Sequence, residues 1–178
     1  MKFLSVALLL AAPLCAQNTA SNRNGQPNAK LPVTCGSEAT HFGVKPDTGQ
    51  HAIAPPEPGK ARVYFIFDSG TVQGAWLVLP VTKFAIDGAW VGAARGDSWF
   101  SVSVEPGEHR FCMALQSSFY SPRPEFVHLN ADAGKVYYYR ARIVISERIL
   151  FLDLNPVDSD EGEYLIASFP MSVSTAKK

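Results

Sequence analysis

The sequence predicts an all-β fold, an antiparallel β-sandwich or partly open barrel of about eight strands. Short segments rich in β-branched and aromatic residues recur between residues 61 and 154, separated by turns that contain Gly, Pro and Asp. Apolar and polar side chains alternate in several of these segments, which is typical of a sheet with one face on a core. We also expect an extended N-terminal arm and a short C-terminal helix.

The clearest unit is a strand-turn-strand pattern over residues 98–115. With Pro106 and Gly107 as the turn, Phe100 falls opposite Met113 in an antiparallel hairpin, and the other apolar residues of this face pair in the same way. The opposite face is mostly polar, apart from Trp99, Cys112 and Ala114. We therefore expect one side of this hairpin in the core and the other side under a covering segment.

The remaining strands follow from similar patterns. Residues 61–67 are rich in β-branched and aromatic side chains, and residues 76–81 contain Pro80, which favours an edge strand or a break. Residues 83–92 predict a hairpin around Asp87-Gly88, a pair that tolerates the positive backbone angles of a primed turn. We expect a third hairpin from 126–130 and 136–145, with Ile145 inward, and a last strand over 149–154.

The C-terminal part predicts a short helix. Asp158 is a suitable N-cap, and the acidic residues that follow it lie near the positive end of the helix dipole. Gly162 weakens this prediction, because glycine is a poor helix former. We place the helix at 158–167, the sandwich domain at 61–170 and a tail at 171–178.

The N-terminus has the features of a secretory signal peptide, residues 1–16. A basic residue precedes an apolar run over 3–12, which is shorter than the ~20 residues that span a bilayer, and Ala16 is a small residue at the expected cleavage point. We expect an exported chain, in the periplasm or outside the cell, without a transmembrane segment. A lipid anchor at Cys15 is the alternative, but Leu14 before the cysteine fits a lipoprotein signal poorly.

Cleavage leaves a nearly neutral chain with two cysteines. The whole sequence has 16 basic and 16 acidic residues, and loss of one Lys gives 15 − 16 = −1, which argues against nucleic-acid binding. Cys35 and Cys112 remain, and an exported protein can join them in a disulfide. Such a bond closes a loop of 112 − 35 = 77 residues, for which the chain-entropy model gives at most about 4 kcal/mol. Two buried free thiols are the alternative.

Two segments precede the predicted sandwich. Residues 17–30 are almost entirely small or polar, so we expect a flexible leader. Residues 31–60 contain five prolines and scattered apolar residues without strand or helix periodicity. We expect this arm to lie in extended form over the outward face of the sheet, held by Cys35 and covering Trp99 and Ala114.

Several turns and strand starts resemble a bacterial envelope family, domain of unknown function 2846. The similarity spans about residues 35–170 and rests on the segments Pro58-Gly59-Lys60-Ala61-Arg62-Val63-Tyr64-Phe65, Ile86-Asp87-Gly88, Val91-Gly92, Pro106-Gly107-Glu108-His109 and Ala133-Gly134-Lys135-Val136-Tyr137-Tyr138. The resemblance implies an exported β-sandwich. It implies no reaction and no ligand.

The sequence shows no pattern typical of an enzyme, so we expect neither catalytic residues nor a cofactor. No Gly-x-Ser-x-Gly elbow occurs, and no glycine loop follows a strand in the way that nucleotide sites require. We expect no metal site either. The acidic run over 158–163 departs from the calcium-loop pattern, and the histidines lack ligand spacing; these are His41, His51, His109 and His128.

Aromatic side chains on outward strand positions suggest binding. Trp90 and Tyr138 point away from the predicted core, and Trp76 lies near the broken strand. Exposed aromatic rings can stack on sugars or on proline-rich segments. Our first hypothesis is a non-enzymatic envelope module that binds or positions a protein or glycan partner, whose identity the sequence does not give. The alternative is a carbohydrate-binding sandwich that uses these three aromatics.

Overall fold

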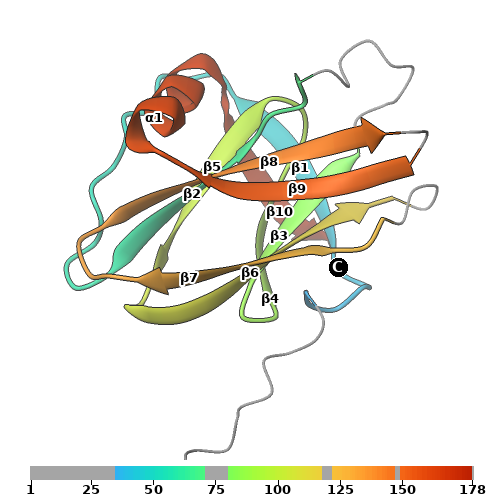
Figure 1. The fold of residues 1–178 in the computed structure, drawn as a ribbon. Coiled ribbons are helices and arrows are strands. Elements are labelled where there is room, and N and C mark those ends of the chain that lie inside the picture. The colour runs from blue at the N-terminus through green and yellow to red at the C-terminus, as the bar shows by residue number, and fades with distance from the viewer. Residues whose placement is uncertain (1–34, 71–79, 118–121, 147–148, 178) are drawn as a thin grey trace, which may run out of the picture. The chain divides into compact units, whose positions relative to one another are not determined.

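The computed structural model describes residues 35–70, 80–117, 122–146 and 149–177. The expected signal peptide, the leader, Cys15 and Trp76 lie outside these residues. The described elements are β1 (His41–Asp47), β2 (Ala61–Phe67), β3 (Val81–Ile86), β4 (Ala89–Ala94), β5 (Ser98–Val104), β6 (Gly107–Gln116), β7 (Glu125–Ala131), β8 (Val136–Ser146), β9 (Ile149–Val157), α1 (Ser159–Ser168) and β10 (Met171–Lys177) (Figure 1).

The described strands form two sheets that face each other as a sandwich (Figure 1). One sheet has the order β1-β10-β5-β2-β8-β9, and the other has the order β4-β3-β6-β7. Most neighbours are antiparallel, whereas β2 runs parallel to β8 and β10 meets β5 in parallel. The predicted all-β sandwich with a short C-terminal helix is therefore confirmed.

The core lies between the sheets and is rich in aromatic rings. Phe65 on β2 is fully buried, and its ring centroid lies 5.1 Å from that of Phe84 and 5.2 Å from that of Phe111, both on the opposite sheet. Phe100 on β5 lies 5.5 Å from the same ring. Tilted and edge-to-face pairs at these distances stabilise a core beyond the area that they bury.

The strands predicted as one hairpin over 98–115 belong to different sheets. β5 pairs with β2, while β6 pairs with β3 and β7, so the chain crosses between the sheets at Pro106-Gly107. The predicted faces are nevertheless correct, because Phe100 and Phe111 both point into the core. They meet across the sandwich, and the predicted side-by-side pairing was wrong.

The same correction applies to the hairpin predicted around 131–135. β7 is the edge of the four-stranded sheet, whereas β8 joins β2 and β9 in the other sheet. Tyr139, Ala141 and Ile143 are buried in the core as expected. Ile145 was expected to be buried too, but it is 46% exposed, because the end of β8 continues beyond the buried core residues.

The hairpin of β3 and β4 is confirmed. Asp87 and Gly88 form its turn with φ angles of 52° and 83°, the left-handed values that a two-residue primed turn requires. A register shift between Phe84 and Ala85 places Phe84 opposite Gly92, whereas a regular hairpin around Asp87-Gly88 would place it opposite Val91. Phe100 lies against Gly92, where a Cβ atom would be 2.9 Å from its Cζ.

Part of the expected arm and part of the expected tail pair with each other. β1 and β10 form an antiparallel pair from His41↔Lys177 to Asp47↔Met171, and Pro46 is tolerated because β1 is an edge strand. Residues 171–177 are therefore a strand, and the description of 171–178 as a tail was wrong. The sheet accordingly extends beyond the strands predicted within 61–170.

The C-terminal helix α1 lies over the outer face of the six-stranded sheet (Figure 1). Asp158 is its N-cap and accepts a hydrogen bond of 2.9 Å from the Glu161 backbone N–H, as predicted. Gly162 is buried against the ring of Tyr138, where a Cβ atom would lie 2.6 Å from Cδ1. The residue that weakened the helix prediction is thus the one that allows the helix to approach the sheet.

Candidate binding surface

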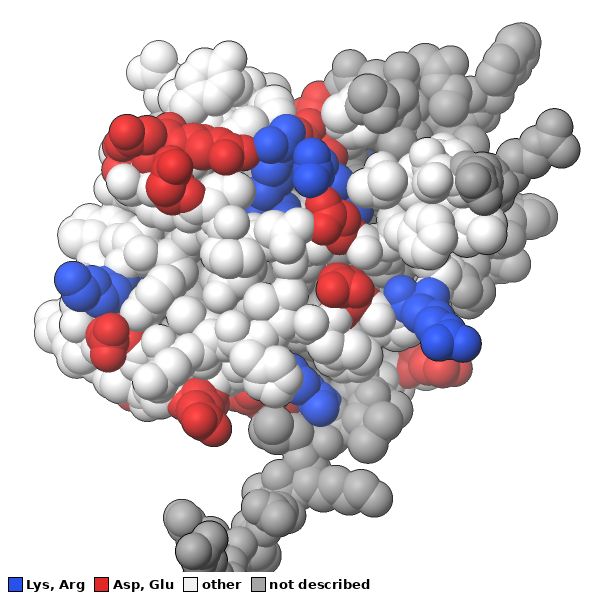
Figure 2. All heavy atoms as spheres, viewed as in Figure 1, with Lys and Arg blue, Asp and Glu red and all other residues white. Residues whose placement is uncertain are grey.

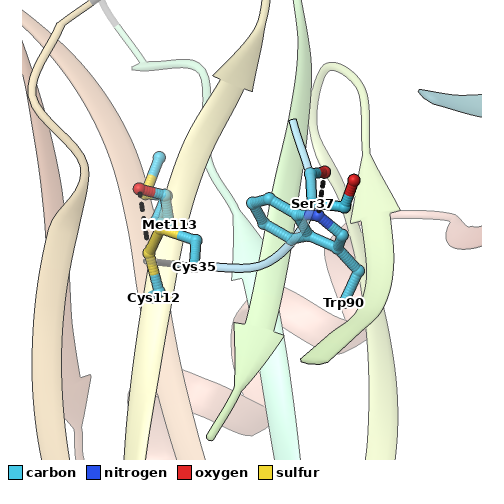
Figure 3. The surroundings of a disulfide bond; sticks show 5 residues. All are labelled: Cys35, Ser37, Trp90, Cys112 and Met113. Carbon is cyan, nitrogen blue, oxygen red and sulfur yellow. Dashed lines mark hydrogen bonds between the residues drawn. A yellow bond between two sulfur atoms is a disulfide. The ribbon is translucent and has the colours of Figure 1, made fainter. Parts of the chain in front are cut away.

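The predicted cysteine pair anchors the arm to the four-stranded sheet. Cys35 and Cys112 form a disulfide with their Cα atoms 5.4 Å apart (Figure 3). Both cysteines are buried beside Ala85, and Trp90 and Ala114 border the cluster. The disulfide therefore lies on the outer face of the sheet, as the alternation in β6 predicted.

Trp90 is outward-facing but is covered by the arm. Its indole Nε1 donates a 2.8 Å hydrogen bond to the Ser37 carbonyl (Figure 3). Gly36 lies so close to the ring that a Cβ atom there would be 2.7 Å from Nε1. Lys83 Nζ lies 4.3 Å from the ring centroid, a distance at which a cation is attracted to the ring. The expected free aromatic platform is therefore not formed at Trp90.

Lys83 is a second contact between the sheet and the arm. It is 5% exposed, and its Nζ donates a 3.0 Å hydrogen bond to the Thr40 carbonyl. Burial lowers the pKa of Lys83, and the charge of Glu38 opposes this effect only in part. The segment from Cys35 to Thr40 is thus held by a covalent bond and by two side chains of the β3–β4 hairpin.

Tyr138 lies beneath α1 and is not accessible to a ligand. It is 6% exposed, and its ring stacks on that of Tyr64 with centroids 5.4 Å apart. Burial raises the pKa of Tyr138 to about 12, and the charge of Glu163 adds to this effect. The expectation that Tyr138 is an exposed binding aromatic is therefore wrong, because the helix covers the outward face of β8.

Trp99 is covered by different elements from those expected. Its sheet is not that of Cys112, so the disulfide does not bring the arm to it. The indole Nε1 donates to the carbonyls of Ile166 and Phe169, at 3.1 and 3.0 Å. A later part of the arm reaches the same cluster, where the ring centroid of His51 lies 6.2 Å from that of Trp99.

Charged groups gather where α1 meets the six-stranded sheet. Arg140 on β8 forms ion pairs with Asp68, which follows β2, and with Glu161 on α1. Figure 2 shows acidic side chains grouped over the helix with basic side chains beside them. Because the acidic groups of Asp68 and Glu161 are already paired with Arg140, this cluster ties the helix to the sheet.

An exposed apolar patch lies at the far end of the β8–β9 pair. Seven large apolar side chains are exposed in the described part of the chain, and four of them belong to this end; the fractions exposed are 39% for Val144, 46% for Ile145, 56% for Ile149 and 49% for Phe151. Val144 lies directly opposite Phe151. We call these four residues the β9 patch. Concentrated exposure of this kind is typical of an interaction surface.

Ile149 and Phe151, two of the four residues of the β9 patch, lie on an edge strand. Among the described strands, β9 pairs with β8 alone and ends the six-stranded sheet. The second half of β9 carries Asp153, which pairs with Arg142 at 2.7 Å, and also Pro156, two features that block further strand pairing. The first half, Ile149-Leu150-Phe151-Leu152, has neither feature. As far as the described residues show, this half is therefore open to another strand.

At the edge strand β4, side chains of β10 form hydrogen bonds with the backbone. Ser172 on β10 donates a 2.8 Å hydrogen bond to the Ala93 carbonyl, and Ser174 accepts a 3.1 Å hydrogen bond from the Ala93 backbone N–H. These side chains occupy polar backbone groups of β4. The β4 edge is thus partly occupied by side chains of β10, and the apolar half of β9 differs from it in this respect.

The sequence interpretation missed the β9 patch, although a signal was present. Apolar residues are consecutive over 143–145 and 149–152, so the alternation of a half-buried strand is lost there. A run with apolar side chains on both faces needs cover on both faces. The sequence could have indicated an uncovered pair of strands, but it could not show that no described element covers the end.

The described residues contain no group of three or more metal-ligating side chains. No helix in the described ranges has the length and apolarity that a membrane span requires.

Comparison of the chain with protein-family models, with curated proteins and with solved structures finds no match. The resemblance to domain of unknown function 2846 therefore stays a prediction, while the disulfide is consistent with an exported protein.

Proposed function

We propose that this protein is an exported, non-enzymatic binding module of the bacterial cell envelope that docks another protein through the β9 patch. One observation carries the proposal: an apolar half-strand at a sheet edge that no described element covers, whereas the outward strand aromatics Trp90 and Tyr138 lie under the arm and α1. An edge strand offers unpaired backbone N–H and C=O groups, and an extended segment of a partner can pair with them.

The chemistry of the patch favours a polypeptide over a glycan. Sugar binding would need free aromatic faces, whereas Tyr138 lies under α1 and Trp90 lies under the arm. The patch offers aliphatic side chains and one Phe. The charges of Arg142 and Asp153, on the same two strands, pair with each other. We therefore expect an uncharged, apolar partner strand.

The energy available is sufficient for a specific contact. Full burial of a large apolar side chain contributes ~1.5–3 kcal/mol, so each half-exposed member of the patch offers on the order of 1 kcal/mol when covered. Hydrogen bonds between the backbones of β9 and the partner strand would also fix the direction and register of that strand. Because the contact is local, we expect a partner segment of a few residues and not a large flat interface.

Site-specific photocrosslinking in the producing cell tests the proposal. A photoreactive amino acid replaces Phe151, and a matched one replaces Tyr164, which is 70% exposed on α1. We expect a discrete protein adduct from position 151 that position 164 does not give. The adduct should disappear when Ile149 is replaced by Asp in the same chain. Absence of an adduct at 151, or the same adducts at both positions, would overturn the proposal.

A further inference from the structure

His109 on β6 contacts two hydrogen-bond acceptors at once. Its Nδ1 lies 2.7 Å from Asp87 Oδ2 in the β3–β4 turn, and its Nε2 lies 2.7 Å from the Glu105 carbonyl oxygen. The side chain is only 14% exposed. A carboxylate and a carbonyl accept hydrogen bonds and do not donate them, so both contacts are satisfied only when both ring nitrogens carry protons.

We infer that His109 is a proton-dependent bridge that holds the crossover between the two sheets against the β3–β4 turn. Glu105 follows β5 of the six-stranded sheet, whereas His109 and the Asp87 turn belong to the four-stranded sheet. The doubly protonated ring therefore links the chain leaving one sheet to a turn of the other sheet. Loss of one proton breaks one of the two contacts.

The surroundings indicate which contact opens. Asp87 is also fixed by the Arg110 backbone N–H, which donates to its Oδ1 at 2.8 Å. A hydrogen bond to a carboxylate is stronger than one to a neutral carbonyl, so the remaining proton stays on Nδ1. The Nε2 contact with Glu105 is then lost, and the crossover at 105–106 loosens.

Several titratable groups from neighbouring elements surround the bridge. Burial acts to lower the pKa of His109, but the Glu105 carbonyl and the Asp87 carboxylate act in the opposite direction and raise it overall. The Glu105 carboxylate is engaged by Lys60 at 3.2 Å. The other ionisable groups on β6 and on the neighbouring strand β7 are Glu108, Arg110, Glu125 and His128.

The direction of the pH effect follows from this raised pKa. A histidine with a higher pKa in the folded state contributes stability that is fully present below its unfolded value of about 6.5. The contribution falls as the pH rises through the folded pKa. The bridge lies where β2 and β8 begin, whereas the β9 patch lies where β8 ends, so this inference does not depend on the proposed function.

Thermal unfolding of the full chain between pH 5.5 and pH 9 tests the inference. The melting temperature of the wild type should exceed that of His109→Gln by a margin that is largest at pH 5.5 and shrinks as the pH rises. Asp87→Asn keeps a turn that Asn-Gly favours, and it should lower the pH at which His109 titrates. His41→Gln, a change at an exposed position, is the matched control and should show no such margin.

Nitrogen-15 NMR of the histidine rings gives an independent test of the same bridge. At pH 5.5 both ring nitrogens of His109 should carry protons, and at high pH only Nδ1 should. The inference is overturned if a single nitrogen is protonated at pH 5.5, or if the margin between the wild type and His109→Gln does not change with pH.

Discussion

Substitution of Gly162 by Ala should destabilise the protein, although Ala is the better helix former. In an unhindered helix this change stabilises by about 1 kcal/mol. Here the added Cβ would lie 2.6 and 2.7 Å from Cδ1 and Cβ of Tyr138, whereas carbon atoms prefer about 3.5 Å or more. Tyr138 cannot yield easily, because its ring is buried and stacked on Tyr64.

The overlap forces α1 away from the sheet by about 1 Å, and overpacking of this kind costs about 1–3 kcal/mol. We therefore expect a net loss of up to about 2 kcal/mol in the free energy of unfolding, measured by urea denaturation with Trp fluorescence. Ala167→Gly, at an exposed position of the same helix, is the control for propensity alone. In a Tyr138→Ala background the penalty should shrink, because the ring contacts are gone. Stabilisation of the wild type by Gly162→Ala would refute this reasoning.

Three further predictions concern the disulfide, the core and a buried hydroxyl. Replacement of Cys35 and Cys112 by Ala should lower the free energy of unfolding by up to about 4 kcal/mol, measured against the oxidised wild type, since the bond closes a 77-residue loop; an unchanged denaturation midpoint would contradict this. Phe65→Ala should cost about 3–5 kcal/mol in the same assay, because the ring is fully buried, whereas Val173→Ala at an exposed position should change stability little. Because the pKa of Tyr138 is raised to about 12, folded-state stability should fall as the pH rises from about 10 to 12, and Tyr138→Phe should lessen this fall; identical pH profiles would argue against it.

The faces of the strands could be predicted from the sequence, but apart from the β3–β4 hairpin the strand partners could not. Alternation places Phe100 and Phe111 on the core side of their strands, and this was correct. The same alternation is compatible with two neighbours in one sheet and with two strands that face each other across a core. Only the path of the chain at Pro106-Gly107 distinguishes these cases, and a turn dipeptide does not specify that path.

β10 escaped prediction because its buried positions carry polar side chains. Ser172 is 5% exposed and is satisfied by the Ala93 backbone, whereas Val173 beside it is 45% exposed. The hydrophobic pattern of this strand is therefore reversed. The expectation of a binding site at Trp90 and Tyr138 failed for a related reason. The alternation of side chains along a strand indicates that both residues face outward, but it does not indicate which segments cover them.

The most direct test of the account is amide hydrogen exchange in β9, with and without the partner protein captured at position 151. Strand addition should slow exchange of amides within Ile149-Leu150-Phe151-Leu152 and leave the amides of β4 unchanged. Unchanged exchange in β9 on binding, or equal protection at both edges, would contradict the claim that the open half of β9 is the docking surface.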